Sequence, residues 1–186
     1  YLGYSSPKTP TRVYLYNLEN KSKKLVKEQE IPSGHNSDDY IVERVEYKSH
    51  DGRLVPLTIT RHKKTKIDGS ANILLYGYGS YGSSMSPNFS STRLSLINRG
   101  IIWATAHIRG GMEKGMKWWK EGKLTNKKNT FEDYIYAAKY LINHNYSSKG
   151  KIIGMGGSAG GLLMGAVVNQ APELFLGIIM AVPFVD

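Results

Sequence analysis

The chain has 186 residues, 40% of them hydrophobic, which is enough for one domain with a substantial core, or one domain and part of another. It has no cysteine, so disulfides, thiolate metal sites and thiol catalysis are excluded. Its net charge of +10 comes from scattered lysines such as Lys127-Lys128, which indicates a solvated surface rather than a nucleic-acid site, and its longest apolar run, residues 176–185, is too short to cross a bilayer.

The first forty residues predict a short β segment and a linker. Residues 12–16 and 24–26 are rich in β-forming side chains and flank a polar turn, a pattern typical of a hairpin. Residues 31–39 are polar and contain Pro32 and Gly34, which suits a linker.

A second hairpin is predicted next in the chain. Residues 41–47 and 54–60 flank Asp51-Gly52, and Asp-Gly between two β-rich runs is a strong hairpin signal. From residue 72 onward the pattern changes, because short apolar runs alternate with helix-like segments. That alternation predicts an α/β fold with a mostly parallel sheet.

The helices and strands of this region are placed from the spacing of their apolar residues. The predicted strands are residues 73–76, 101–106, 151–153 and 177–182. The predicted helices are residues 91–98, a helix opened by Thr130, and a helix that follows Ser158. Thr130-x-x-Asp133 matches a capping box. The helix that it opens has an apolar stripe at helical spacing, made of Phe131, Ile135, Ala138, Leu141 and Ile142.

Ser158 lies in a glycine-dense segment, residues 154–161, between an apolar strand and a helix. A serine at the tip of such a turn is the usual way in which a hydrolase exposes a nucleophile. Side chains two positions to either side would collide in so sharp a turn, so glycine is expected at Gly156 and Gly160. The backbone N–H of Ala159, at the start of the helix, would be placed to bind an oxyanion.

Two other interpretations of the same segment stay open. Gly154-x-Gly156-x-x-Ala159 also fits the fingerprint of a dinucleotide-binding loop. Glu173 and Asp186 are poorly placed to hold the ribose of such a ligand. The segment could also be a glycine-rich turn with a purely structural role.

A second glycine-rich loop, residues 76–82, follows the predicted strand 73–76. The active sites of parallel-sheet enzymes lie beyond the carboxyl ends of the strands, so this loop and Ser158 should open on the same edge. In many hydrolases a loop in this position supplies a second oxyanion donor, and a tyrosine hydroxyl can do this. The alternative is an aromatic turn that only packs.

Several stretches together make the chain similar to the prolyl oligopeptidase family of serine peptidases, and most similar to its oligopeptidase B (protease II) branch. They include LLYGYGSYG, HIRGG, GKLTNKKNTFEDY and GGSAGGLLMG, and they cover most of residues 41–186 in the order of the family. The matching segments are residues 74–82, 93–100, 107–111, 122–134, 156–165, 169–175 and 182–186.

The resemblance implies a partial α/β-hydrolase fold preceded by a short β segment. Residues 1–35 would be the tail of a β-propeller domain and a linker, and residues 36–186 the N-terminal portion of the peptidase domain. The C-terminal part of that domain would be missing from this chain.

The resemblance also implies roles for individual residues. Ser158 would be the nucleophile, and Tyr78, through its hydroxyl, and Ala159, through its N–H, would form the oxyanion hole. Tyr81 would line the substrate pocket. The expected activity is endopeptidase cleavage of short peptides after Lys or Arg, through an acyl-enzyme. It needs no metal or organic cofactor, and the expected location is cytoplasmic.

The histidines depart from this pattern. The triad order in this fold is Ser…Asp…His, whereas all five histidines, His35, His50, His62, His107 and His144, precede Ser158. The chain alone is therefore expected to be inactive. Asp186 is interpreted as a structural aspartate of the family. Met112 stands where the family usually has glycine, which leaves the local loop geometry open.

Other polar residues near these motifs have simpler interpretations. His107 is expected to be a structural histidine rather than a base, and Glu113 and Asp133 to be loop and cap residues. Trp118-Trp119 is expected to pack in the core. An esterase or another acyl hydrolase on the same framework is the alternative function, and a dinucleotide-binding module is a further one.

Overall fold

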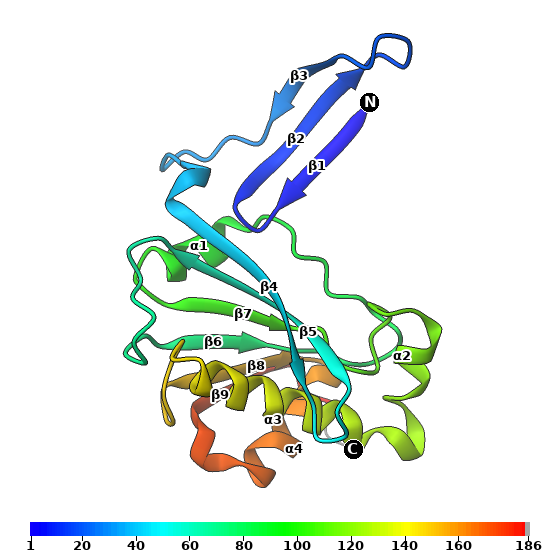
Figure 1. The fold of residues 1–186 in the computed structure, drawn as a ribbon, viewed down its shortest axis with the longest axis vertical. Helices are drawn as coiled ribbons and strands as arrows, with labels where there is room; N and C mark the ends of the chain where they lie inside the picture. Colours follow the sequence, from blue (N-terminus) through cyan, green and yellow to red (C-terminus); the bar gives the residue numbers. More distant parts are fainter. Residues whose placement is uncertain (185–186) are drawn as a thin grey trace.

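A computed structural model of the chain describes residues 1–184 and shows two separate sheets (Figure 1). The smaller sheet is antiparallel, in the order β1-β2-β3, and projects from one end of the molecule (Figure 1). Its strands are β1 (Leu2–Ser6), β2 (Thr9–Tyr16) and β3 (Lys23–Glu28). The predicted hairpin is confirmed as β2 and β3, while β1 was not predicted. The segment between β3 and β4 contains only the short 3-10 helix η1 (Ser37–Asp39).

The larger sheet has six strands in the order β4-β5-β7-β6-β8-β9. The second predicted hairpin is confirmed as β4 and β5, which pair antiparallel. β5 also pairs antiparallel with β7, while β7, β6, β8 and β9 run parallel to one another. The expectation of a mostly parallel sheet holds for these last four strands. The bounds are β4 (Tyr40–Lys48), β5 (Leu54–His62), β6 (Ile73–Tyr76), β7 (Ile102–Ala106), β8 (Ile152–Gly157) and β9 (Phe175–Ala181).

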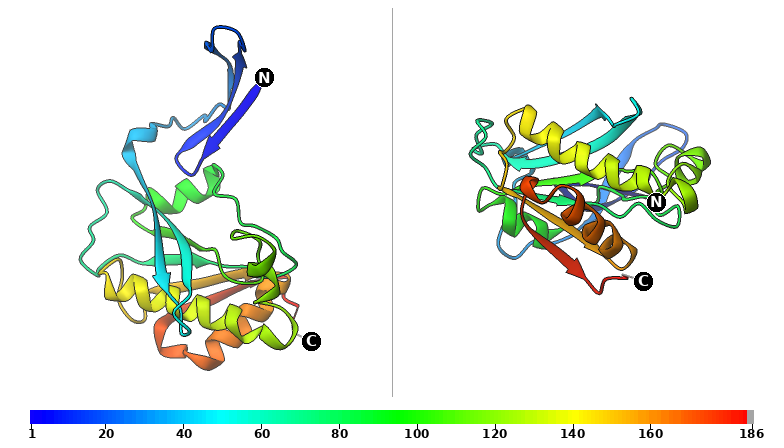
Figure 2. Two further views of the ribbon diagram at one scale, coloured as in Figure 1. Left: turned by 45° about the vertical axis from the view of Figure 1, so that its right-hand side comes forward. Right: turned by 90° about the horizontal axis from the view of Figure 1, so that it is seen from below.

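Helices cover both faces of this sheet. The long helices α3 and α4 lie side by side on one face (Figure 2), and α1 packs on the other through Leu94 and Ile97. The helices are α1 (Ser91–Ile97), α2 (Met116–Lys120), α3 (Lys128–Asn143) and α4 (Ala159–Gln170), with the 3-10 helices η2 (Leu124–Asn126) and η3 (Pro172–Leu174). No helix among residues 1–184 is long and apolar enough to span a bilayer.

The main core lies between the sheet and the two long helices. Alternate strand residues such as Leu57, Leu75 and Ala104 are fully buried against it. The predicted apolar stripe of α3 is confirmed, since Ile135, Ala138 and Leu141 are buried and the other two residues are partly buried against the same cluster. Burying one such aliphatic side chain contributes about 1.5–3 kcal/mol, so this layer is the main source of stability for the site above it.

The predicted capping box of α3 is wrong. The helix begins at Lys128, so Thr130 and Asp133 lie inside it rather than at its cap. Both side chains are buried and bind the loop after β7 instead of the helix terminus: Thr130 Oγ1 donates to the Arg109 carbonyl, and the Asp133 carboxylate accepts from Arg109. A tertiary contact therefore takes the polar groups that the sequence pattern assigned to a local cap.

The edge strand β9 exposes several large apolar side chains. Leu176, Ile179 and Met180 are each more than two fifths exposed, with values of 60%, 43% and 45%. β9 has β8 as its neighbour on one side only, so its other side is an edge of the sheet among the described residues.

Candidate active site

Ser158 is positioned by the turn that joins β8 to α4. Its backbone has φ 53° and ψ −121°, and a positive φ in a residue with a Cβ is strained by about 1–3 kcal/mol. Hydrogen bonds hold this geometry, because the Ser158 N–H donates to Ala181 O at 2.9 Å and its carbonyl accepts from Gly161 and Phe184. The side chain is exposed and makes no capping bond to α4. The turn therefore presents an exposed side-chain hydroxyl.

The glycines around Ser158 are required by close backbone contacts. A Cβ on Gly156 would overlap the carbonyl of Gly160, and one on Gly161 would lie 2.5 Å from Pro183 Cα. These contacts confirm the collision predicted for Gly156. Gly160 has a different neighbour, since a Cβ there would lie 3.1 Å from the Gly77 carbonyl oxygen and 3.4 Å from Tyr78 Cδ2. The Ser158 turn thus touches the loop after β6 directly.

That loop begins at the carboxyl end of β6, which is the neighbour of β8 in the sheet. The Gly77 N–H donates to Met155 O at 3.1 Å, which ties the start of the loop to the strand leading to Ser158. Tyr78 is half-buried and its ring packs on Gly160. The structure therefore brings Tyr78 and Ala159, the predicted oxyanion donors, to the same edge as Ser158.

A cavity of about 460 Å³ opens between this loop and the start of α4. Tyr81 and Ala159 both line it, together with Trp119 and Leu162. Tyr81 is 76% exposed. Lys123 and Lys127 are the charged residues on its described walls.

His107 lies at the end of β7 and is almost completely buried. Its Nε2 is 2.8 Å from Thr58 Oγ1, and its Nδ1 is 3.6 Å from the Glu113 carboxylate. Burial alone would raise the pKa of Glu113, but the nearby His107 imidazole and the hydrogen bond from the Met85 N–H lower it below its usual value. Within residues 1–184, the imidazole hydrogen bonds of His107 are all on Nε2, with Thr58 and Arg44, and its Nδ1 faces the Glu113 carboxylate without a hydrogen bond. Glu113 accepts from the Met85 N–H and so anchors that loop.

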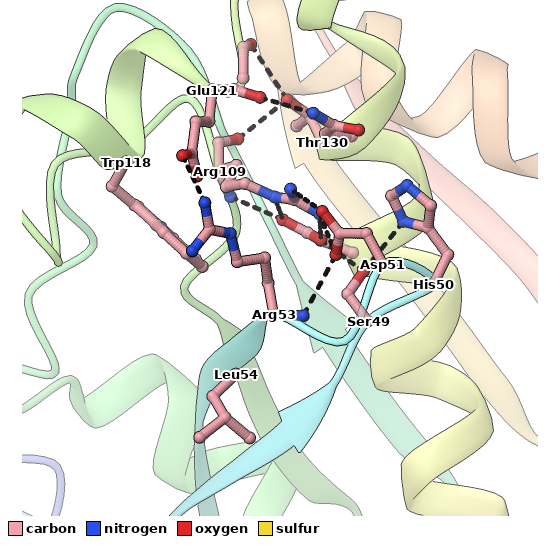
Figure 3. A network of polar contacts seen from close by, with 12 residues as sticks. Ser49, His50, Asp51, Arg53, Leu54, Arg109, Trp118, Glu121 and Thr130 are labelled. Atoms are coloured by element: carbon pink, nitrogen blue, oxygen red, sulfur yellow. Dashed lines mark hydrogen bonds and ion pairs between the residues drawn. The ribbon is translucent and has the colours of Figure 1, made fainter.

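A buried ionic network around Arg109 was not predicted from the sequence (Figure 3). Its guanidinium Nε and Nη2 donate to Asp133 at 2.9 and 2.6 Å, and Nη2 also donates to Asp51 at 3.2 Å. Ser49 adds a 2.6 Å bond to Asp133. Burial alone would lower the pKa of Arg109, but its bonds to Asp133 and Asp51 raise it, so the side chain stays charged.

This network connects segments that pack next to the loop carrying Tyr78. Arg109 joins the turn of the β4–β5 hairpin to α3 and to the loop after β7. The adjacent Gly110 packs so tightly on Gly79 that a Cβ would overlap its carbonyl oxygen, and the Gly82 N–H donates to Gly110 O at 2.9 Å. The only signal in the sequence was that Arg109 follows a predicted strand at the same sheet edge as Ser158.

The remaining residues singled out in the sequence lie in the core, at the cavity or outside the described residues. Trp118 is buried in the core and Trp119 lines the cavity, so the packing interpretation holds for Trp118. Met112 places its terminal methyl close to Gly82. Asp186 lies outside the described residues. Within residues 1–184, no three His, Asp or Glu side chains are grouped in a way that could hold a metal ion.

The comparisons with known proteins agree with this geometry. The profile of the prolyl oligopeptidase family matches residues 87–186. Dipeptidyl aminopeptidase BI from Pseudoxanthomonas mexicana is 47% identical over 99% of this chain and 25% of its own length. Protease 2 from Moraxella lacunata is 43% identical over 100% of the chain and 27% of its own length.

Solved structures give the same picture. Oligopeptidase B from Leishmania major superposes with a TM-score of 0.92 at 42% identity, over 99% of this chain and 26% of that one. The expected α/β-hydrolase fold is thereby confirmed. The chain spans about a quarter of the length of the relatives that it matches.

Proposed function

This chain belongs to the prolyl oligopeptidase family of serine peptidases, and from that premise we propose that Ser158 is its nucleophile. The observation that carries the proposal is the exposed Ser158 hydroxyl on a positive-φ turn packed against the Tyr78 loop. Family membership also favours this hydrolase turn over a dinucleotide fingerprint for residues 154–161.

The chemistry follows from this arrangement. Ser158 Oγ attacks the carbonyl carbon of the peptide while a histidine takes its proton. The negative charge that develops on the carbonyl oxygen is stabilised by the Tyr78 hydroxyl and the Ala159 N–H. The amine leaves with the proton from the histidine, and water then hydrolyses the ester on Ser158.

We use 'the whole protein' for a polypeptide that carries this sequence within a complete catalytic domain. We propose that the catalytic histidine and aspartate belong to the part of that domain outside this chain. No histidine follows Ser158 here, and His107 is almost completely buried with its Nε2 bonded to Thr58 and Arg44. We infer that the 186-residue chain alone has almost no activity. Residues 1–35 would be the propeller tail and linker, which is supported by the separate sheet β1–β3 and its exposed Leu2 and Tyr4.

The proposed substrates of the whole protein are short peptides cut after Lys or Arg. The relatives carry different names, among them dipeptidyl aminopeptidase, protease 2 and prolyl endopeptidase. The described cavity walls carry Lys123 and Lys127 and no carboxylate. Acidic groups that hold a basic side chain would therefore come from outside residues 1–184. A cytoplasmic location stays a prediction from the sequence.

A substrate panel tests this proposal. Fluorogenic peptides with Lys, Arg or Pro before the cleaved bond are compared with a short-chain nitrophenyl ester, and kcat/KM is measured for each. The whole protein should prefer the Lys and Arg peptides, and the 186-residue chain should turn over none of them. A strong preference for the ester would instead indicate an acyl hydrolase, and efficient turnover by the short chain would overturn the assignment of the base.

Replacing Tyr78 by phenylalanine tests the oxyanion hole. The ring that packs on Gly160 is kept, so only the hydroxyl is lost. We expect kcat of the whole protein to fall by about 10²–10³ with little change in KM, as for the loss of one oxyanion donor. Tyr76→Phe, at the end of β6, is the matched control and should keep its activity. An unchanged kcat in Tyr78→Phe would remove Tyr78 from the mechanism.

A further inference from the structure

Lys127 reaches into the loop that carries Tyr78 and Tyr81. It lies directly before α3, and its ammonium donates to the Gly79 carbonyl at 2.6 Å and to Ser80 Oγ at 2.8 Å. The side chain is half-buried and forms no ion pair within residues 1–184. A lysine that was expected on the solvated surface is thus desolvated against two uncharged oxygens.

The backbone of the loop, residues 77–82, has an unfavourable conformation that other contacts must stabilise. Gly79 has φ 67° and Tyr81 has φ 56°, and the second value is unfavourable for a residue with a side chain. The two ends of the loop are fixed by backbone bonds, from Gly77 to Met155 and from Gly82 to Gly110. Lys127 binds the middle, between the residue proposed to hold the oxyanion and the residue that lines the cavity.

The position of Lys127 is costly for stability alone. Burial lowers the pKa of Lys127 to about 8, so the protein spends free energy to keep the ammonium there near neutral pH. Buried ion pairs can often be replaced by apolar side chains with no loss of stability, or with a gain. The two hydrogen bonds to the loop are therefore the feature that distinguishes Lys127 from a lysine on the solvated surface.

We propose that Lys127 is a positioning residue, which sets the turn between Tyr78 and Tyr81 so that the Tyr78 hydroxyl lies where the oxyanion forms. The inference rests on the proposed role of Tyr78. Lys127 acts through Gly79 and Ser80, the two residues of the loop to which it donates hydrogen bonds. A displacement of about 1 Å in a catalytic group can cost about 10² in rate, so the loss of these two bonds should be visible in kcat.

The first experiment is a double-mutant cycle in the whole protein. Lys127→Met should lower kcat by about tenfold to a hundredfold, with a smaller change in KM and an unchanged or higher melting temperature. In the Tyr78→Phe background the same substitution should cost much less, because residues that act through one another are not additive. Lys127→Arg, which keeps the donors, should recover part of the rate. Lys128→Met, an exposed neighbour, is the control.

The second experiment does not depend on activity. Hydrogen exchange of the 186-residue chain should become faster at residues 77–83 in Lys127→Met and stay unchanged in Lys128→Met. If Lys127→Met keeps its kcat, or if its loss multiplies fully with that of Tyr78→Phe, or if exchange in the loop is unchanged, the inference is wrong. If the proposed role of Tyr78 is itself wrong, Tyr78→Phe will leave kcat unchanged. That result distinguishes a failure of the proposed function from a failure of the inference about Lys127. Lys127→Gln serves as the second variant should the methionine variant unfold.

Discussion

Replacing Ser158 by alanine in the whole protein should abolish peptide hydrolysis. Loss of the nucleophile in a serine hydrolase lowers kcat by a factor on the order of 10⁶, and no change in KM could compensate for this. A fluorophosphonate probe, which reacts with activated serines, should label the unsubstituted whole protein at Ser158 and leave Ser158→Ala unlabelled. Mass spectrometry of the labelled tryptic peptide, which begins at Ile152 after the cleavage at Lys151, identifies the site.

The fold should survive this substitution. Alanine has the same backbone restrictions as serine at φ 53°, and the hydrogen bonds to Ala181, Gly161 and Phe184 come from the backbone. Ser95→Ala, on the exposed side of α1, is the control and should be labelled as the unsubstituted protein is. Labelling that persists in Ser158→Ala would mean that the reactive serine lies elsewhere and that the turn after β8 is structural.

The second large effect is on stability, at Arg109. Arg109→Met should lower the free energy of unfolding of the chain by about 3–5 kcal/mol, because removing one partner of a buried ion pair leaves the other charge uncompensated. The Asp133 carboxylate is fully buried and would keep only its bonds from Ser49 and the Arg109 N–H. Urea unfolding followed by circular dichroism measures the difference.

A nearby surface pair provides the control. Arg53 and Glu121 form an ion pair at 2.8 Å in the same region (Figure 3), with side chains 47% and 22% exposed. Arg53→Met should cost less than about 1 kcal/mol, as is usual for exposed pairs. Equal losses for Arg53→Met and Arg109→Met would show that burial of the Arg109 network contributes nothing special.

Acid should weaken the same network. Burial alone would raise the pKa of Asp51, but its hydrogen bonds from Arg109 and the Arg53 N–H lower it below the usual value. A carboxylate with a lowered pKa in the folded state contributes stability above its unfolded pKa of about 4 and loses it as the pH falls through the folded value. The stability gap between the parent chain and Arg109→Met should therefore narrow in acid.

Short-range patterns predicted the parts of the fold that short-range physics determines. The strand 73–76 was placed to the residue, and the glycine turn at Ser158 followed from sterics between neighbours in sequence. The short helix α2 was missed because five residues are too few to show helical periodicity, and the edge strand β1 because it has no run of apolar residues.

Contacts between distant residues escaped prediction. Asp133 was assigned to a local cap because its partner Arg109 lies 24 residues away, and Asp51 is 58 residues from Arg109. Lys127 was assigned to the surface for the same reason, since its acceptors lie 48 and 47 residues earlier. Only the folded chain brings these charges to the acceptors that explain their burial.

The open flank of β9 has a practical consequence for work with the isolated chain. A strand with unpaired backbone groups and protruding aliphatic side chains is a template on which a second polypeptide can add its own strand. Leu176, Ile179 and Met180 would promote such stacking as the concentration rises. Activity of the isolated chain should therefore be measured in dilute samples that light scattering shows to be free of aggregates. A lack of turnover can then be attributed to the missing catalytic groups rather than to aggregation.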